Sequence, residues 1–123
     1  MMSKTAVQDY DDIVNAIQPY LDGAKAGEGD LMKPAFHADA TVFGYLGDAV
    51  VSGPIKLIYD WTDSVGPAPD VSPRIVDVDV AGTAASVRVE VDNWHEHRFT
   101  DMFNLLKVDG KWTVVNKIFH THA

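Results

Sequence analysis

The first half of the chain carries its hydrophobic residues at helical spacing. Over residues 6–26 they recur at steps of three and four positions, which predicts one helix with a single apolar stripe. The stripe consists of Tyr10, Ile13, Ile17, Leu21 and Ala24. Pro19 lies inside this segment and lacks a backbone donor, so we expect it to kink the helix or to split it.

Shorter elements are predicted before residue 66. Asp30 can cap a second helix that ends near Phe36. A third helix is expected between Gly53-Pro54 and Gly66-Pro67, because proline suits the first helical turn and glycine the end of a helix. Two short strands between these helices are predicted at residues 41–46 and 49–51.

After Pro73 the hydrophobic residues alternate with polar ones, which predicts strands with one buried and one solvated face. The predicted strands lie near residues 76–80, 87–91, 99–108 and 111–119. Asp109-Gly110, between the last two, is a strong hairpin signal. Three helices followed by long strands indicate one α+β domain over residues 1–123, with the helices packed on one face of a curved, mainly antiparallel sheet.

The composition restricts the classes of partner. With 18 acidic and 10 basic residues among 123, the formal net charge is −8. This charge argues against nucleic acid and against an anionic membrane surface. The absence of cysteine excludes disulfides, thiolate catalysis and cysteine-bound metals. The first residues lack an apolar signal core and no apolar run matches a membrane span, so we expect a cytoplasmic protein.

A resemblance to a known superfamily is carried by residues 29–40 (GDLMKPAFHADA) and residues 99–120 (FTDMFNLLKVDGKWTVVNKIFH). The first segment resembles the passage from helix to first strand in nuclear transport factor 2-like proteins. The second resembles the final hairpin of their lumazine-binding and SnoaL-like branch. The resemblance implies a cone-shaped α+β fold with a pocket between helices and sheet, and a homodimer formed through the outer sheet face. It leaves the chemistry open, because the superfamily includes ketosteroid isomerase, dehydratases, cyclases and non-enzymatic carriers.

The final hairpin predicts which side chains face the pocket. A two-residue turn at Asp109-Gly110 pairs Val108 with Lys111, and the pairs further out follow by counting. The pairs predicted on the pocket face are Phe99 with His120, Asp101 with Ile118, and Phe103 with Asn116. A one-residue bulge would exchange these faces.

Asp101 is the leading candidate for chemistry. Among apolar neighbours its carboxyl group would be desolvated, which raises its pKa and suits it to take a proton from carbon beside a carbonyl or to hold a ligand donor. We pair it with His120 as a candidate acid–base couple. The alternative is structural: Asp101 would accept hydrogen bonds that tie the helices to the sheet.

Aromatic side chains from the predicted helices and strands, together with polar ones on the final hairpin, could line a cavity for a flat ligand. The predicted ligand-binding residues are Tyr20, Phe43, Tyr45, Trp61, Phe99, Phe103 and Asn116. Aromatic residues at these spacings also build ordinary cores, which is the alternative interpretation.

Four histidines fall near one end of the predicted hairpin, with His97 opposite His122. The others are His95 and His120. Imidazoles on one strand face can bind a metal, but these lie at a turn and at the end of the chain, where residues tend to fray. We predict no metal site, and the sequence contains no dinucleotide or phosphate-binding motif, so we predict no cofactor.

Three functions remain open from the sequence. The first is binding of an aromatic or polycyclic small molecule in the pocket. The second is a cofactor-independent lyase, isomerase or cyclase that uses Asp101 and His120. The third is a dimeric interaction module with a vestigial pocket, because apolar residues on the opposite face would otherwise be exposed. That outer set is Met102, Leu106, Val115 and Phe119.

Overall fold

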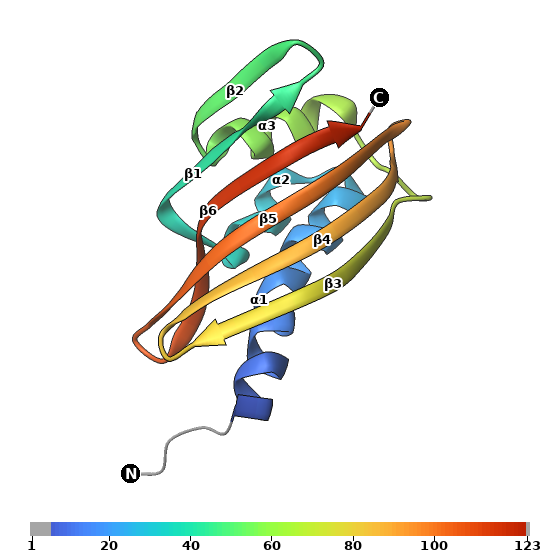
Figure 1. Cartoon of the computed structure of the whole chain (residues 1–123). Helices are drawn as coiled ribbons and strands as arrows, with labels where there is room; N and C mark the ends of the chain where they lie inside the picture. The colour runs from blue at the N-terminus through green and yellow to red at the C-terminus, as the bar shows by residue number, and fades with distance from the viewer. Residues whose placement is uncertain (1–5, 123) are drawn as a thin grey trace.

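A computed structural model describes residues 6–122, in which a curved six-stranded sheet is covered on one face by helices (Figure 1). The helical elements are α1 (Ala6–Ala26), α2 (Gly29–Met32), a 3-10 turn (Lys33–Ala35) and α3 (Lys56–Val65). The strands are β1 (Phe36–Leu46), β2 (Ala49–Pro54), β3 (Ser72–Ala81), β4 (Ala84–Trp94), β5 (His97–Val108) and β6 (Lys111–His122). Residues 1–5, on which the expectation about a signal segment rests, lie outside the described residues.

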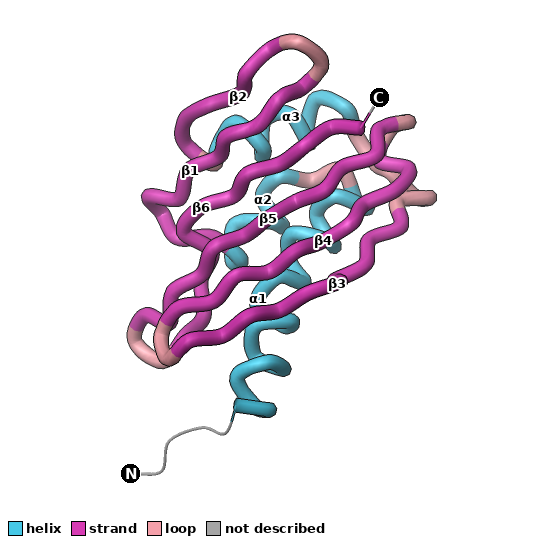
Figure 2. The backbone as a smooth tube through the Cα atoms, in the orientation of Figure 1, coloured by secondary structure: helices cyan, strands magenta, loops and turns pink. Residues whose placement is uncertain are grey.

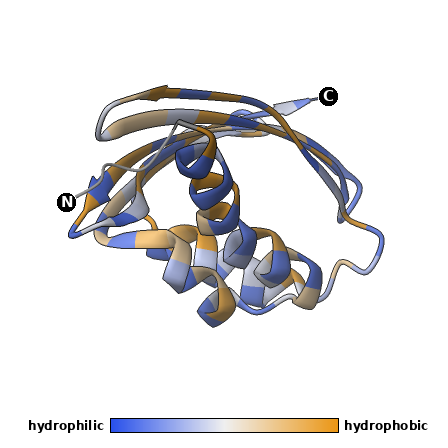
Figure 3. Ribbon diagram, turned by 90° about the horizontal axis from the view of Figure 1, so that it is seen from below, coloured by the Kyte–Doolittle hydropathy of each residue, from blue (hydrophilic) through white to orange (hydrophobic). Residues whose placement is uncertain are grey.

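The strands are arranged in the order β2-β1-β6-β5-β4-β3 (Figure 2). Neighbours are antiparallel except β1 and β6, which run parallel. Seen along the layers, the sheet arches over the helices and leaves its convex face uncovered by them (Figure 3). The predicted α+β class, with helices on a curved and mainly antiparallel sheet, is confirmed.

Helix α1 is continuous from Ala6 to Ala26, as its apolar stripe predicts. Ile13, Ile17 and Tyr20 are buried against the sheet. Pro19 does not split the helix, so that alternative is wrong. The missing backbone donor costs one hydrogen bond, but tertiary packing of the apolar face on both sides of Pro19 keeps the helix together.

No helix within the described part of the chain is long and apolar enough to cross a membrane.

Two predicted boundaries are wrong. The segment after Asp30 leaves the helical state at Met32, continues as the 3-10 turn that contains Pro34, and is already strand at Phe36. Gly53-Pro54 ends β2 instead of opening the third helix. Phe36 pairs with Val114 of β6, which ends the helical segment, and Pro54 pairs with Thr41 of β1, which outweighs the preference of proline for a helix start.

A β-bulge in β6 decides which side chains face the helices. Leu105 pairs with Val114 but Asn104 pairs with Asn116, so Val115 is the extra residue. Beyond this point the pairing is shifted by one residue from simple counting. Lys117 is therefore buried beneath the helices, whereas Ile118 is 43% exposed on the outer face.

Candidate functional site

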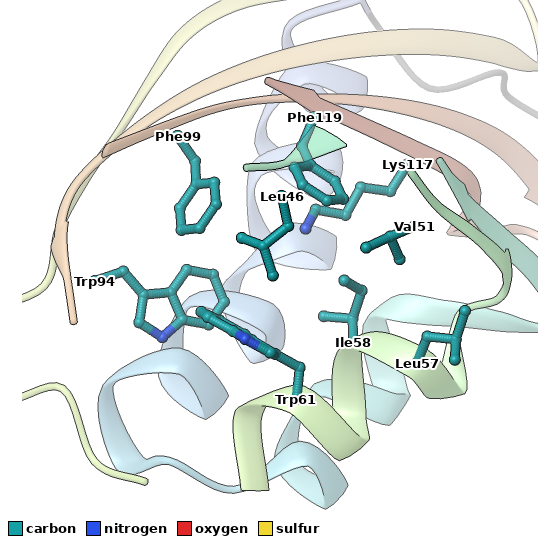
Figure 4. A pocket seen from close by; sticks show the side chains of 9 residues that line it. All are labelled: Leu46, Val51, Leu57, Ile58, Trp61, Trp94, Phe99, Lys117 and Phe119. Atoms are coloured by element: carbon teal, nitrogen blue, oxygen red, sulfur yellow. The ribbon is translucent and has the colours of Figure 1, made fainter. Parts of the chain in front are cut away.

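A pocket of about 190 Å³ opens between α3, the β1–β2 hairpin and the concave face of the sheet (Figure 4). Most of its lining is apolar or aromatic. The lining residues are Leu46, Val51, Leu57, Ile58, Trp61, Trp94, Phe99, Lys117 and Phe119. Apolar concave sites with few polar groups are typical of small-molecule binding.

The aromatic wall of the pocket is held by edge-to-face contacts. The ring of Trp61, on α3, lies 5.1 Å from that of Trp94 at the end of β4. Phe99, near the start of β5, lies 6.0 Å from Trp61 and 5.7 Å from Trp94. Three rings from three elements therefore support one another, which fixes the shape of this side of the pocket.

Lys117 is the only charged residue that lines this pocket within residues 6–122. It is 3% exposed, and its side chain lies alongside the sheet with the nitrogen pointing into the pocket (Figure 4). Its Nζ lies 4.9 Å from the ring centre of Phe119 and 5.0 Å from that of Tyr20. Lysine usually extends its amine to water, so an amine held among rings is unusual.

A carboxylate lies behind this amine. Lys117 Nζ is 3.6 Å from Asp101 Oδ1, and the hydroxyl of Tyr20 donates a hydrogen bond of 2.7 Å to Asp101 Oδ2. Asp101 is 0% exposed, and within residues 6–122 its Oδ1 has no hydrogen-bond partner. The site is thus a chain of three polar groups, Tyr20, Asp101 and Lys117, that ends at the pocket wall.

Burial moves the pKa values of the acid and the base toward each other. It raises the pKa of Asp101, against the opposing effects of the nearby Lys117 ammonium and the Tyr20 hydroxyl. It lowers the pKa of Lys117, against the opposing effect of the Asp101 carboxylate. The pKa of Tyr20 is raised well above its usual value by burial and by the same carboxylate. A proton can therefore pass between Lys117 and Asp101 at a lower free-energy cost than it would in water.

Five of the predicted site residues lie between the helices and the sheet. Trp61 and Phe99 line the pocket itself. Asp101, Tyr20 and Phe103 are buried behind it, and the rings of Tyr20 and Phe103 lie 5.2 Å apart.

The other four lie on the outer face. His120 pairs with Thr100 and is exposed, and Asn116 donates a hydrogen bond to Thr41. Phe43 and Tyr45 are 48% and 58% exposed. The predicted juxtaposition of Asp101 and His120 is wrong because the bulge at Val115 turns the second half of β6 over.

Lys117 is the residue that the sequence analysis missed. Counting strand pairs outward from the turn at Asp109-Gly110, with no bulge, places Lys117 on the outer face of the sheet. The signal that could have found it is the pair Val114-Val115, where two adjacent apolar residues interrupt the alternation of β6.

The histidine arrangement also differs from the prediction. His122 pairs with Arg98 instead of His97, and its Nε2 lies 2.8 Å from Thr100 Oγ1. His95 Nε2 lies 2.9 Å from the carbonyl oxygen of Gly66. Within residues 6–122 no group of three or more histidine, aspartate and glutamate side chains is placed to hold a metal ion.

Similar proteins have been found by sequence and by structure. The chain is 50% identical to an NTF2-like protein of unknown function from Methylobacillus flagellatus KT, with a TM-score of 0.93 over 100% of this chain and 99% of that one. A second such protein, from Shewanella baltica OS155, is 46% identical, with a TM-score of 0.94 over 98% and 99% of the two chains. "Aldolase FrzH" from Cladobotryum sp is 29% identical over 115 residues, which are 93% of this chain and 92% of the relative.

A family profile described as "Putative lumazine-binding" matches residues 8–120. The match begins in α1 and ends two residues before the end of β6, so it includes every element that forms the pocket. The chain therefore belongs to the family described as "Putative lumazine-binding", within the nuclear transport factor 2-like superfamily.

Proposed function

We propose that the protein binds a small molecule of about the size of one aromatic ring, with an oxygen acceptor directed at Lys117. The observation that carries this proposal is the composition of the pocket wall: apolar and aromatic side chains with a single buried cation. The apolar wall would take up the ring, and the buried amine would fix its orientation through one charge-assisted hydrogen bond.

The volume supports a ligand of this size. An apolar cavity of about 150 Å³ in another protein takes up benzene, and the pocket here measures about 190 Å³. A carbonyl or carboxylate oxygen suits the amine of Lys117, because an ammonium has only donors. The relative called an aldolase agrees with this choice, since an aldolase by definition acts on a carbonyl compound.

Blocking the pocket should abolish binding without disturbing the sheet. In the native protein we expect benzoate, benzaldehyde or phenol at millimolar concentration to raise the thermal unfolding midpoint, because a ligand of the folded state stabilises it. Val51→Phe should remove this shift, since Val51 lines the pocket. Val50→Phe is the matched control, because Val50 is the adjacent residue and is 57% exposed on the other face. The proposal fails if no probe raises the midpoint, or if Val51→Phe retains the full shift.

We also propose that two copies associate through the outer sheet face. Exposed apolar side chains from β1, β5 and β6 lie side by side there, because Ile118 pairs with both Phe43 and Met102. Of the predicted outer set, Met102 and Leu106 are each 43% exposed on this face, whereas Phe119 lines the inner pocket. A two-fold pairing would cover the same patch on both subunits.

Light scattering tests the association. We expect the mass of a dimer for the native chain at micromolar concentration. Ile118→Lys should yield a monomer, because the new charge would be desolvated at the centre of the contact. Asp48→Lys, in the exposed turn between β1 and β2, controls for the added positive charge. A monomer mass for the native chain would contradict the proposal.

A further inference from the structure

Burial of the Lys117 amine costs free energy of folding, and the contacts of the amine within the protein do not explain why it is buried. A lysine removed from water loses hydration, and a buried ion pair recovers this loss only with good geometry and further hydrogen bonds. Here the Nζ–Oδ1 distance is 3.6 Å, longer than a strong charge-assisted hydrogen bond, and Oδ1 has no other partner within residues 6–122. Asp101 on β5 and Lys117 on β6 also belong to the same sheet, so their contact does not join the sheet to the helices.

The same geometry suits a nucleophile. The amine lies at an apolar pocket (Figure 4) and 3.6 Å from Asp101 Oδ1, which can accept its proton. Only the neutral form of an amine carries the lone pair that attacks carbon, and the apolar surroundings favour that form against the opposing effect of the Asp101 carboxylate. Tyr20 holds the far oxygen of the carboxylate at 2.7 Å, so Oδ1 is directed to Lys117.

From this arrangement we propose that Lys117 forms a Schiff base with the carbonyl carbon of an aldehyde or ketone held in the pocket, and that Asp101 takes up and returns the proton. The inference rests on the proposed function, because it requires the carbonyl compound to occupy the same pocket. Lys117 is a catalytic residue, since its nitrogen bonds to the substrate carbon. Asp101 is a catalytic residue as well, because it takes up the ammonium proton and gives it to the leaving hydroxyl group.

The step balances without a further reactant. The Lys117 ammonium gives one proton to Asp101 Oδ1, and the amine then forms a C–N bond while the π electrons of the carbonyl move to oxygen. That oxygen takes a proton from the new nitrogen cation to form a carbinolamine. The hydroxyl group leaves as water with the proton from Asp101, and the nitrogen lone pair forms C=N. The products are one iminium ion, paired with the Asp101 carboxylate, and one water molecule.

The iminium ion offers reaction chemistry beyond binding. Its positive charge withdraws electrons from the neighbouring carbon, so a C–H or C–C bond beside the former carbonyl becomes easier to break or to form. The substrate class is therefore a small aldehyde or ketone, and the reaction class is bond making or breaking next to its carbonyl carbon.

Reductive trapping tests the inference. Benzaldehyde and sodium cyanoborohydride are added to the native protein near neutral pH, and the Schiff base is fixed as a benzyl group on the lysine nitrogen. Peptide mapping by mass spectrometry should place the label on Lys117. We expect its labelling rate to exceed that of exposed Lys56, because burial lowers the pKa of Lys117 and so raises the fraction of neutral amine. Equal labelling of Lys117 and Lys56 would overturn the inference.

Three variants separate chemistry from folding. Lys117→Met removes the amine and should abolish the specific label. Val51→Phe keeps the amine and its partner Asp101 but fills the pocket, and should lower labelling of Lys117 to the level of Lys56. Val50→Phe should label like the native chain. Labelling of Lys117 that survives Val51→Phe would show that the pocket is not the reaction site.

The pH dependence tests the part played by Asp101. Labelling should rise with pH as the Lys117 ammonium loses its proton, and should begin at lower pH than labelling of Lys56 because burial lowers the pKa of Lys117. In Asp101→Asn this rise should move to still lower pH, since the carboxylate that opposes the effect of burial is gone. An unchanged position of the rise would contradict the interaction of Asp101 with the Lys117 amine on which the proton transfer depends.

Benzyl alcohol distinguishes failure of this inference from failure of the proposed function. It has the same ring and one oxygen but no electrophilic carbon. A midpoint shift with benzyl alcohol and no trapping of benzaldehyde would retain the binding site and overturn the Schiff base. No shift with either compound and no label would overturn both.

Discussion

Replacing Asp101 by leucine is expected to lower the free energy of unfolding by about 3–5 kcal/mol, because it leaves the Lys117 ammonium buried without a counter-charge. Lys117→Met should cost a similar amount for the opposite reason, since Asp101 then keeps only its hydrogen bond from Tyr20. The double variant should recover most of the loss, because an apolar pair in place of a buried ion pair is often neutral or stabilising by about 1–4 kcal/mol. Urea unfolding of the four proteins gives the interaction energy directly.

A further variant at Tyr20 tests the polar group that the double variant leaves without a partner. In the double variant its hydroxyl has lost its acceptor, and an unsatisfied buried donor costs about 1–3 kcal/mol. Adding Tyr20→Phe should therefore stabilise the double variant, although the same change in the native chain removes a 2.7 Å hydrogen bond to a carboxylate and should destabilise it. Additive losses for Asp101→Leu and Lys117→Met would mean that the two side chains do not interact.

The pH dependence of stability follows from the directions of the two shifts. The raised pKa of Asp101 means that the folded state holds its proton more tightly, so this group makes the protein less stable as pH rises from about 3.9 through the folded value. The lowered pKa of Lys117 means that the folded state releases its proton first, so this group makes the protein more stable as pH rises from the folded value toward about 10.4. A pair kept at this cost in stability is consistent with a role in the pocket.

The sequence predicts the layers of the fold better than it predicts the site. Period-two alternation and the Asp109-Gly110 turn identify β5 and β6, and they assign Asp101 correctly to the inner face. The face of residues beyond Val115 depends on one extra residue in the ladder. The pair Val114-Val115 interrupts the alternation, but two adjacent apolar residues alone do not determine that a bulge forms there. For this reason counting from the turn places His120 on the inner face and Lys117 on the outer face, whereas in the structure Lys117 is buried and His120 is exposed.

A similar limit applies to β1. Phe43 and Tyr45 alternate with Gly44 and Leu46, so the sequence reveals two faces but not which one is inner. The choice is set by parallel pairing of β1 with β6, some 75 residues away, where Thr41 opposes Asn116. Gly44 lets β1 lie close to Phe119 of β6 on the inner face of the sheet, because a Cβ on Gly44 would lie 2.6 Å from the backbone oxygen of Phe119. Contacts of such separation in sequence have no local signal.

Gly27→Ala should destabilise the protein by roughly 2–5 kcal/mol through two separate effects. Gly27 ends α1 with φ of +71°, a left-handed conformation that costs other residues about 1–2 kcal/mol. A Cβ at this position would also lie 2.2 Å from the carbonyl carbon of Gly66 and from the nitrogen of Pro67. Backbone atoms cannot move aside as a side chain can, so the end of α1 and the loop after α3 must separate, at a further cost of about 1–3 kcal/mol.

Gly47→Ala isolates the first effect. Gly47 has φ of +62°, in the turn between β1 and β2, and no atom lies within 4 Å of a Cβ built there. Its loss of stability should be only the conformational cost, about 1–2 kcal/mol, and the difference between the two variants measures the clash. The loop after α3 is also tied to α1 by a hydrogen bond of 3.0 Å from the backbone N–H of Ala68 to the carbonyl oxygen of Lys25. Moving this loop would displace the end of the helix that carries Trp61, so Gly27→Ala should weaken binding of benzoate, benzaldehyde or phenol whereas Gly47→Ala leaves it unchanged. Equal losses of stability in urea unfolding would refute the close approach of α1 to this loop.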